Sequence, residues 1–194
     1  THTAGEVSKF VNEFIAGNIE QASLKAIDII NNGFNMYYTR NLENAKNYCR
    51  KRYSGYNNKR YGLLASSKNK ELKNYGLRSE FELDIVTWFN GEIGDKNFSN
   101  SLELVISEFN CQGLEVDMPI IVWGKDLKWH NSAWLPEGKN DSDKAYRLNS
   151  YRVLLTRGRD GFIVFIPPIA EMDIIENLFK NIGVKKLEEA WSHC

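Results

Sequence analysis

Hydrophobic and polar positions follow two different periods along this chain. In residues 7–16 and 19–31 the apolar side chains recur every three or four positions, which is the spacing of an amphipathic helix. Asn41 is a candidate N-cap that predicts a third helix to about Tyr53, and residues 174–182 with Gly183 as a stop predict a closing helix. Apolar or β-prone runs of strand length lie at 34–39, 60–66, 102–109 and 118–123. Because helices and strands alternate in the first part of the chain, the pattern predicts an α/β fold with a mainly parallel sheet.

The periodicity is weaker in two parts of the chain. Residues 81–89 fit either a strand or a short helix, and the polar segment 91–100 predicts a loop. A longer polar stretch, 125–146, reads as an insertion that contains Trp129 and Trp134. These tryptophans either stack on a ligand or fold the insertion back on the domain, and the second is favoured. No linker or repeat interrupts the pattern, so the 194 residues predict one domain.

Composition narrows the class of protein. Hydrophobic residues make up 42% and charged residues 26% of the chain, so a sizeable core is expected. The formal net charge is zero, which argues against nucleic-acid binding through overall charge but allows a local basic patch. No apolar run approaches the roughly 20 residues that span a bilayer. The three cysteines and three histidines are scattered, so neither a disulfide framework nor a metal site is expected, and we expect a cytoplasmic protein without membrane contact.

The stretch 148–168 combines structure with candidate chemistry. Two apolar runs flank the sequence TRGR, in which Arg157 and Arg159 carry the charge. The runs predict a buried hairpin or a helix–strand unit that holds both arginines at its turn. Guanidinium groups fixed in this way suit bidentate recognition of phosphate or carboxylate. Two solvated arginines at an ordinary turn are the alternative.

A second group of polar residues follows the apolar run that ends at Phe109. Gln112, Gly113 and Glu115 form a turn in which the glycine permits close backbone approach and the side chains offer hydrogen-bonding groups. We expect this turn and the two arginines to lie at the carboxyl ends of parallel strands, where ligands bind in open α/β sheets. An ordinary joint whose carboxylates cap the next helix is the alternative.

The segment 46–60 places six basic residues among three tyrosines. Cationic and aromatic side chains together suit single-stranded nucleic acid, whose phosphates pair with cations and whose bases stack on rings. Arg50, Arg52 and Tyr53 are the candidates for this binding. The alternative is a helix whose last turn carries basic residues that complement its dipole.

The order of the two polar motifs resembles that of superfamily 1 helicases. Their last two motifs correspond here to residues 111–117, around QGLE, and to residues 151–159, around YRVLLTRGR. The sequences SEFNCQGLEVD, LNSYRVLLTRGRDG and RYGLLASSK are similar to those of a bacterial family of Schlafen-like, helicase-type proteins. This resemblance covers residues 7–168.

The resemblance implies a second RecA-like domain, with a mostly parallel sheet flanked by helices. Arg157 then matches the arginine finger, which stabilises charge on the transferring phosphoryl group, and Arg159 supports it. Gln112, Gly113 and Glu115 match the turn that contacts the nucleotide.

The same resemblance implies partners outside this chain. ATP and Mg²⁺ are bound mainly by an N-terminal RecA-like domain that carries the P-loop, and Ser66 and Ser67 are expected to contact DNA or RNA. The chain has no G-x-x-x-x-G-K-[ST] sequence, so we expect no ATP hydrolysis from it alone. Two alternatives stay open. One is a non-catalytic module that binds nucleic acid or a protein, and the other is a structural domain in which Arg157 is locked in a salt bridge.

Overall fold

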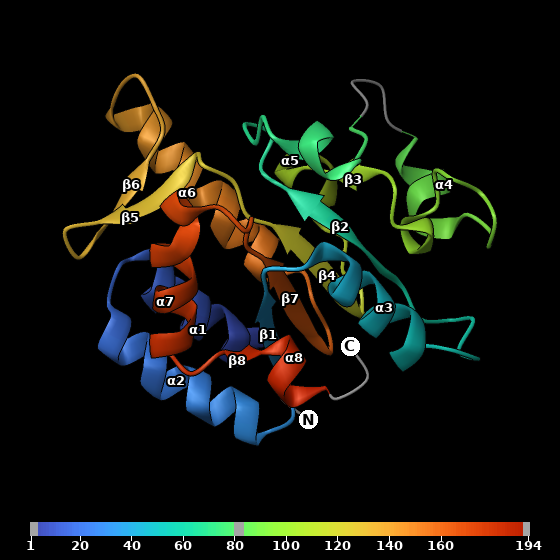
Figure 1. The fold of residues 1–194 in the computed structure, drawn as a ribbon, viewed down its shortest axis with the longest axis horizontal. Coiled ribbons are helices and arrows are strands. Elements are labelled where there is room, and N and C mark those ends of the chain that lie inside the picture. Colours follow the sequence, from blue (N-terminus) through green and yellow to red (C-terminus); the bar gives the residue numbers. More distant parts are fainter. Residues whose placement is uncertain (1–3, 80–83, 192–194) are drawn as a thin grey trace.

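The computed structural model describes residues 4–79 and 84–191 and has a six-stranded parallel sheet at its centre (Figure 1). Every adjacent pair of strands is parallel, in the order β3-β2-β4-β7-β1-β8, which confirms the predicted RecA-like α/β class. The strands are β1 (Asn35–Thr39), β2 (Tyr61–Ala65), β3 (Val105–Ile106), β4 (Met118–Val122), β7 (Gly161–Phe165) and β8 (Lys185–Lys186).

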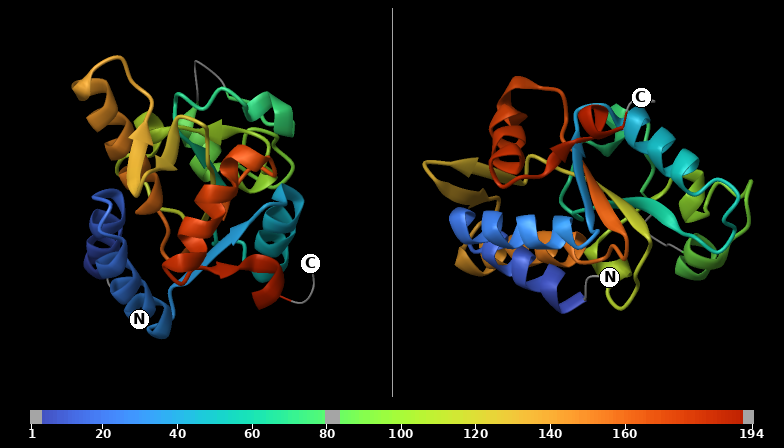
Figure 2. Two further views of the ribbon diagram at one scale, coloured as in Figure 1. Left: turned by 60° about the vertical axis from the view of Figure 1, so that its left-hand side comes forward. Right: turned by 90° about the horizontal axis from the view of Figure 1, so that it is seen from below.

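Helices cover both faces of the sheet. Figure 2 shows α1, α2 and α6 on one face and α3 on the other. The helices are α1 (Ala4–Ile15), α2 (Ile19–Asn31), α3 (Leu42–Arg52), α4 (Ile85–Asn90), α5 (Glu108–Cys111), α6 (Asp141–Leu155), α7 (Asp173–Asn181) and α8 (Leu187–Ala190). A separate antiparallel hairpin, formed by β5 (Leu127–His130) and β6 (Ala133–Pro136), follows β4.

Alternate residues of the central strand β7 enter two separate cores. Phe162 and Val164 belong to the cluster that includes α1, α2 and α6, whereas Ile163 and Phe165 belong to the cluster that includes α3. Successive side chains of a strand face opposite sides of the sheet. Because both sides of this sheet are covered, its central strands must be continuously apolar.

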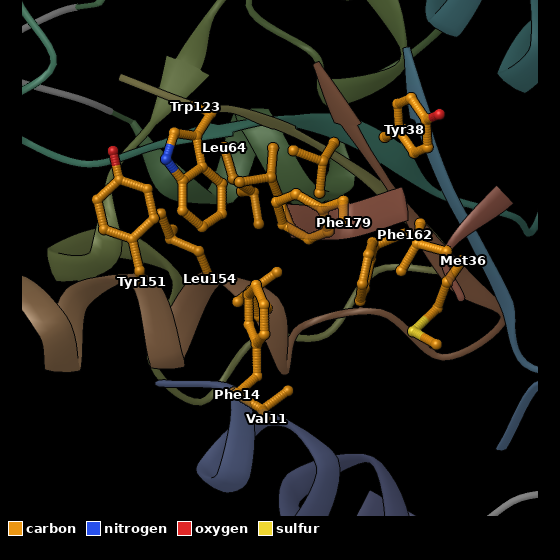
Figure 3. Close-up of a cluster of buried hydrophobic side chains, with 14 of the residues drawn as sticks. Val11, Phe14, Met36, Tyr38, Leu64, Trp123, Tyr151, Leu154, Phe162 and Phe179 are labelled. Atoms are coloured by element: carbon orange, nitrogen blue, oxygen red, sulfur yellow. The ribbon is translucent and has the colours of Figure 1, made fainter. Parts of the chain in front are cut away.

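Aromatic side chains join three helices to the sheet in the larger core (Figure 3). The ring of Trp123, directly after β4, lies 4.5 Å from the Tyr151 ring of α6 and 5.2 Å from the Phe179 ring of α7, measured between centroids. The Phe14 ring of α1 lies 5.1 Å from Phe179. This packing fixes where α6 lies, and α6 leads directly into the arginine motif.

Side-chain caps set the beginnings of α3 and α6. Asn41 accepts a hydrogen bond from the backbone N–H of Asn44 at 3.2 Å, as expected for the start of the third helix. Asn140 accepts one from Asp143 at 2.9 Å. The insertion 125–146 therefore ends earlier than expected, because its last residues already belong to α6. The candidate stretch that follows is a helix–strand unit, the second of the two forms expected for it.

Two further expectations need correction or completion. Of the run 102–109 only Val105 and Ile106 pair with β2, because Ser107 caps α5 by accepting a hydrogen bond from the Phe109 N–H at 3.3 Å. The segment 81–89 contains the start of the short helix α4, although its residues 81–83 lie outside the described part of the chain.

The two tryptophans of the insertion fold it onto the domain, as expected. Trp129 and Trp134 face each other across the β5–β6 hairpin with ring centroids 4.9 Å apart. The indole N–H of Trp134 donates to the backbone carbonyl of Phe14 at 2.9 Å, which ties the hairpin to α1.

Candidate functional site at the amino edge of the sheet

The two sequence motifs lie side by side at the amino ends of β4 and β7. Val116 forms a parallel bridge with Gly158, and its N–H donates to the Arg157 carbonyl at 3.0 Å. The Arg159 N–H donates to the Val116 carbonyl at 2.9 Å. The expected position at the carboxyl ends of the strands was wrong, because Glu115 comes before β4 and Arg157 lies between α6 and β7.

Two glycines of the second motif make this close arrangement possible. A Cβ atom on Gly158 would overlap the carbonyl oxygen of Gly161 and lie 2.9 Å from Cδ of Pro119. A Cβ atom on Gly161 would overlap the carbonyl oxygen of Asn35 in β1. Neither glycine has a positive φ. The motif therefore needs glycine for space and not for an unusual backbone angle.

Arg157 is half-buried, and its guanidinium joins the two motifs. Nη1 donates to the carbonyls of Cys111 and Leu114, both at 3.3 Å, and Nη2 donates to the Thr156 hydroxyl at 3.1 Å. These partners are uncharged, and no described carboxylate forms an ion pair with Arg157. Its Nε is buried without a hydrogen-bond partner. Arg157 therefore presents a positive charge, not neutralised by a described carboxylate, beside the turn that follows α5.

That turn is open to solvent. Gln112, Gly113 and Glu115 are exposed, and Gly113 has a φ of +78°, in the left-handed region where glycine is favoured. The Glu115 carboxylate lies 3.3 Å from Nε of Arg159, and both side chains are about half exposed. Such an exposed pair contributes about 0–1 kcal/mol, so a ligand can displace it at little cost.

Cys111, the last residue of α5, is an unreactive thiol. Burial raises its pKa to about 11, against a smaller opposing effect of the Arg157 charge. A thiol with this pKa is protonated at neutral pH and is a poor nucleophile. The chemistry available at this edge is therefore hydrogen bonding and positive charge.

The basic, tyrosine-rich segment reaches the same edge. The Tyr53 hydroxyl donates to the Asp160 carboxylate at 2.8 Å, and Nη2 of Arg52 lies 4.0 Å from that carboxylate. Burial, followed by this hydrogen bond, raises the pKa of Tyr53, so its hydroxyl stays protonated as a donor. Arg50 is exposed on the last turn of α3, where its charge also complements the helix dipole.

The residues assigned to nucleic acid do not form one surface. Arg50, Arg52 and Tyr53 precede β2, whereas Ser66 and Ser67 follow it. The five residues of β2 separate the two groups by roughly 16 Å, since a strand rises about 3.3 Å per residue. The serines therefore lie at the carboxyl edge of the sheet.

The carboxyl edge holds a buried ionic network that the sequence analysis missed. Nη1 of Arg147 lies 3.7 Å from the Glu108 carboxylate, and its Nε lies 3.4 Å from Asp126. These three residues are at most 4% exposed. Arg147 also donates to the Ser66 hydroxyl at 2.6 Å. The contact with Asp126 is an ion pair without hydrogen-bond geometry, because neither atom has a hydrogen-bond partner.

Neighbouring groups donate hydrogen bonds to both oxygens of the Glu108 carboxylate but to one oxygen of Asp126. Glu108 accepts hydrogen bonds from the Ser67 N–H at 2.7 Å, the Ser67 hydroxyl at 2.8 Å and the Ser150 hydroxyl at 3.0 Å. Asp126 accepts one from the Tyr151 hydroxyl at 2.6 Å. The signal in the sequence was the helical spacing of Arg147, Ser150 and Tyr151, which puts polar residues on the buried stripe of α6.

The described residues contain no group of three or more His, Cys, Asp or Glu side chains placed to hold a metal ion. At the amino edge Asp117 is already occupied, since it accepts from the Arg60 N–H at 2.8 Å and lies 3.5 Å from Lys59. Nor does the described part of the chain include a helix with the length and apolar character to cross a membrane.

A family model described as Schlafen group 3, DNA/RNA helicase domain, matches residues 1–168. The chain belongs to this family. The matched part of this Schlafen group 3 helicase domain includes both motifs of the amino edge, the buried network and all strands except β8. The resemblance expected from the motifs is thereby confirmed at the level of a helicase-related domain. A comparison with curated protein sequences finds no match.

Proposed function

We propose that this chain is the C-terminal motor domain of an ATP-dependent DNA or RNA helicase or translocase. In this proposal Arg157 is the arginine finger of an ATP site shared with a P-loop domain. The P-loop domain would bind most of the ATP and the Mg²⁺, which supply the phosphoryl group and the metal charge. This chain supplies positive charge beside the transferring phosphate.

The observation that carries the proposal is the setting of Arg157. Its hydrogen bonds to the carbonyls of Cys111 and Leu114 hold both ends of the Gln112 turn, so the turn and the arginine move together. Of the two N–H groups of Nη2, one is bonded to Thr156, and no described atom accepts from the other. A guanidinium held by neutral partners at an exposed edge suits a phosphate that arrives from another domain.

The alternative of a structural domain predicts an ion-paired Arg157 and a covered edge. Within the described residues the partners of Arg157 are neutral oxygens, and Gln112, Gly113 and Glu115 are exposed. These observations favour the arginine-finger role of Arg157 over a purely structural domain. The alternative of a non-catalytic binding module rests on the basic, tyrosine-rich segment 46–60 or on the insertion with Trp129 and Trp134, and not on Arg157.

The test uses the protein in which this domain is joined to its P-loop domain. Arg157→Ala should lower kcat for ATP hydrolysis by about 10³ to 10⁵, with nucleotide affinity changed far less, because a finger acts on the transition state. Arg157→Lys should recover little of the lost kcat, because lysine lacks the planar guanidinium group that can form two parallel hydrogen bonds with a phosphate. Lys180→Ala, which removes an exposed charge from α7, is the control and should keep full turnover. Near-normal hydrolysis by Arg157→Ala would overturn the proposal.

A further inference from the structure

One lysine side chain joins the two motifs of the amino edge. Nζ of Lys59 lies 3.5 Å from the carboxylate of Asp117, the last residue of the first motif. The same Nζ lies 3.7 Å from the carboxylate of Asp160, which directly follows the second motif. Lys59 itself belongs to neither motif and comes from the connection between α3 and β2. A third segment of the chain therefore reaches the setting of Arg157.

The two carboxylates lie on neighbouring stretches of backbone. The Asp160 N–H donates to the Asp117 carbonyl at 2.9 Å, so the two acidic residues are direct neighbours. Like charges this close repel each other, and the repulsion is stronger where burial excludes water. The Asp117 side chain is 6% exposed and that of Asp160 is 28% exposed. A positive charge shared by both carboxylates replaces this repulsion with attraction.

The backbone of Lys59 is fixed, so its charge is held near the two carboxylates. The Lys59 N–H donates to the Tyr56 carbonyl at 3.2 Å, and the Lys59 carbonyl accepts from the Asn100 side-chain amide at 3.1 Å. The next residue, Arg60, pairs twice with Asp117. Its N–H donates to the carboxylate at 2.8 Å, and its carbonyl accepts from the Asp117 N–H at 2.8 Å. Because its backbone is already ordered, Lys59 loses little further freedom when it pairs with the carboxylates.

The two carboxylates depend on Lys59 to different extents. Asp160 also accepts a hydrogen bond from the Tyr53 hydroxyl at 2.8 Å and lies 4.0 Å from Arg52. For Asp117, Lys59 is the only cation within 4.0 Å among the described residues. Loss of the Lys59 charge would thus leave a buried carboxylate without a counter-charge, next to a second carboxylate.

The position of Arg157 depends on how far apart the two motifs lie. Arg157 belongs to the second motif, but its guanidinium donates to the carbonyls of Cys111 and Leu114 in the first. Regular pairing of β4 and β7 starts further into the sheet, so the isolated Val116–Gly158 bridge and its backbone hydrogen bonds join the motifs. The charged side chains next to this bridge therefore influence the spacing of the motifs.

We propose that Lys59 is a positioning residue of the ATP site. By holding Asp117 and Asp160 together, it fixes the two motifs at the spacing that places Arg157 against the transferring phosphate. The inference rests on the proposed function and deepens it, because it names a residue outside both motifs that the arginine finger needs. A displacement of about 1 Å in an active site can cost about 10²-fold in rate. Lys59 does not touch the nucleotide, so its loss should lower kcat and leave nucleotide affinity unchanged.

The first experiment measures ATP hydrolysis and the Kd for ADP in the protein in which this domain is joined to its P-loop domain. All variants are compared at a temperature at which circular dichroism shows them folded. Lys59→Met keeps the apolar length of the side chain without its charge, and it should lower kcat by about 10- to 100-fold with an unchanged Kd. Lys59→Arg keeps the charge and should retain most of the wild-type kcat.

A second substitution shows whether the lost charge is the cause. Asp117→Asn, added to Lys59→Met, removes the buried charge that lost its partner, while the amide oxygen can still accept from the Arg60 N–H. This double variant should recover most of the lost kcat. Lys128→Met is the matched control with full turnover, because the Lys128 side chain is 37% exposed against 34% for Lys59 and pairs with Glu171 at 3.3 Å. Near-normal kcat in Lys59→Met, or no recovery in the double variant, would overturn the inference.

The second experiment is independent of ATP. Hydrogen exchange followed by mass spectrometry, on the same proteins, reports the backbone bonds between the motifs. These are the bond from the Val116 N–H to the Arg157 carbonyl at 3.0 Å and the bond from the Arg159 N–H to the Val116 carbonyl at 2.9 Å. Both amides should exchange at least about 5-fold faster in Lys59→Met, with wild-type rates in β4 and β7. Unchanged exchange at both amides would contradict the role of Lys59.

Failure of this inference can be separated from failure of the motor proposal. If Arg157→Ala loses turnover while Lys59→Met keeps it, only the positioning role of Lys59 is wrong. If Arg157→Ala keeps turnover, the arginine-finger role is wrong. In that case faster exchange in Lys59→Met still supports Lys59 as the residue that holds the two motifs together, and unchanged exchange overturns it.

Discussion

Replacing Arg147 with methionine should destabilise the domain strongly. Methionine keeps much of the apolar volume of the side chain but removes the only described cation within 4 Å of both Glu108 and Asp126. Both carboxylates are buried, at 3% and 1% exposure, so water cannot replace the lost charge. The variant therefore isolates the electrostatic part of the network.

The magnitude follows from what each carboxylate retains. Glu108 keeps three hydrogen bonds from Ser67 and Ser150, whereas the carboxylate of Asp126 keeps one described hydrogen bond, from Tyr151. Asp126 is thus the less compensated charge. Removing one member of a buried ionic group costs about 3–5 kcal/mol. For a domain of this size that loss corresponds to a fall in Tm of about 6–20 °C.

The assay is urea denaturation followed by circular dichroism. Arg152→Met is the control on the same helix: Arg152 is half-buried and bonds to Asn149, so its loss should cost less than about 1 kcal/mol. Adding Asp126→Asn to Arg147→Met should restore part of the stability, because it removes the uncompensated charge. A loss in Arg147→Met below about 1 kcal/mol, or no recovery in the double variant, would refute this account of the network.

Two further variants test the amino edge. Gly158→Ala should cost about 1–3 kcal/mol or more, because its Cβ collides with the Gly161 carbonyl. Gly5→Ala, at an exposed position in the first turn of α1, should be neutral or stabilising. Equal unfolding midpoints for Gly158→Ala and Gly5→Ala would exclude a steric requirement for glycine at position 158. Burial raises the pKa of Cys111 from its ordinary value of 9.0 to about 11 in the folded state, so its stabilising effect is complete below pH 9 and is lost as the pH rises to about 11. Wild type should lose about 3 kcal/mol more than Cys111→Ala over that interval, measured by urea denaturation at each pH, and parallel curves would contradict the burial of this thiol.

The hydrophobic pattern of the sequence was sufficient to predict most helices and strands, but it did not predict the edge of the sheet at which the two motifs lie. Helical spacing located α1 and α2, because each buries one apolar stripe, and local start and stop residues, Asn41 and Gly183, located α3 and α7. The start of α6 was assigned to the insertion, since its first two turns are exposed and polar. Without that helix the direction of the chain through Arg157 could not be read, and the motif was assigned to the wrong end of β7.

The sequence by itself determined the class of fold, the two motifs and their resemblance to helicases, because apolar period and motif order are local properties. Only the tertiary structure decided which edge carries which group. It brought Arg157 onto the Gln112 turn through the parallel pairing of β4 and β7, and it placed Ser67 on the opposite edge. It also gathered Glu108, Asp126 and Arg147, which are distant in sequence, into one buried network. Such juxtapositions depend on strand order, and the spacing of residues along a chain does not specify that order.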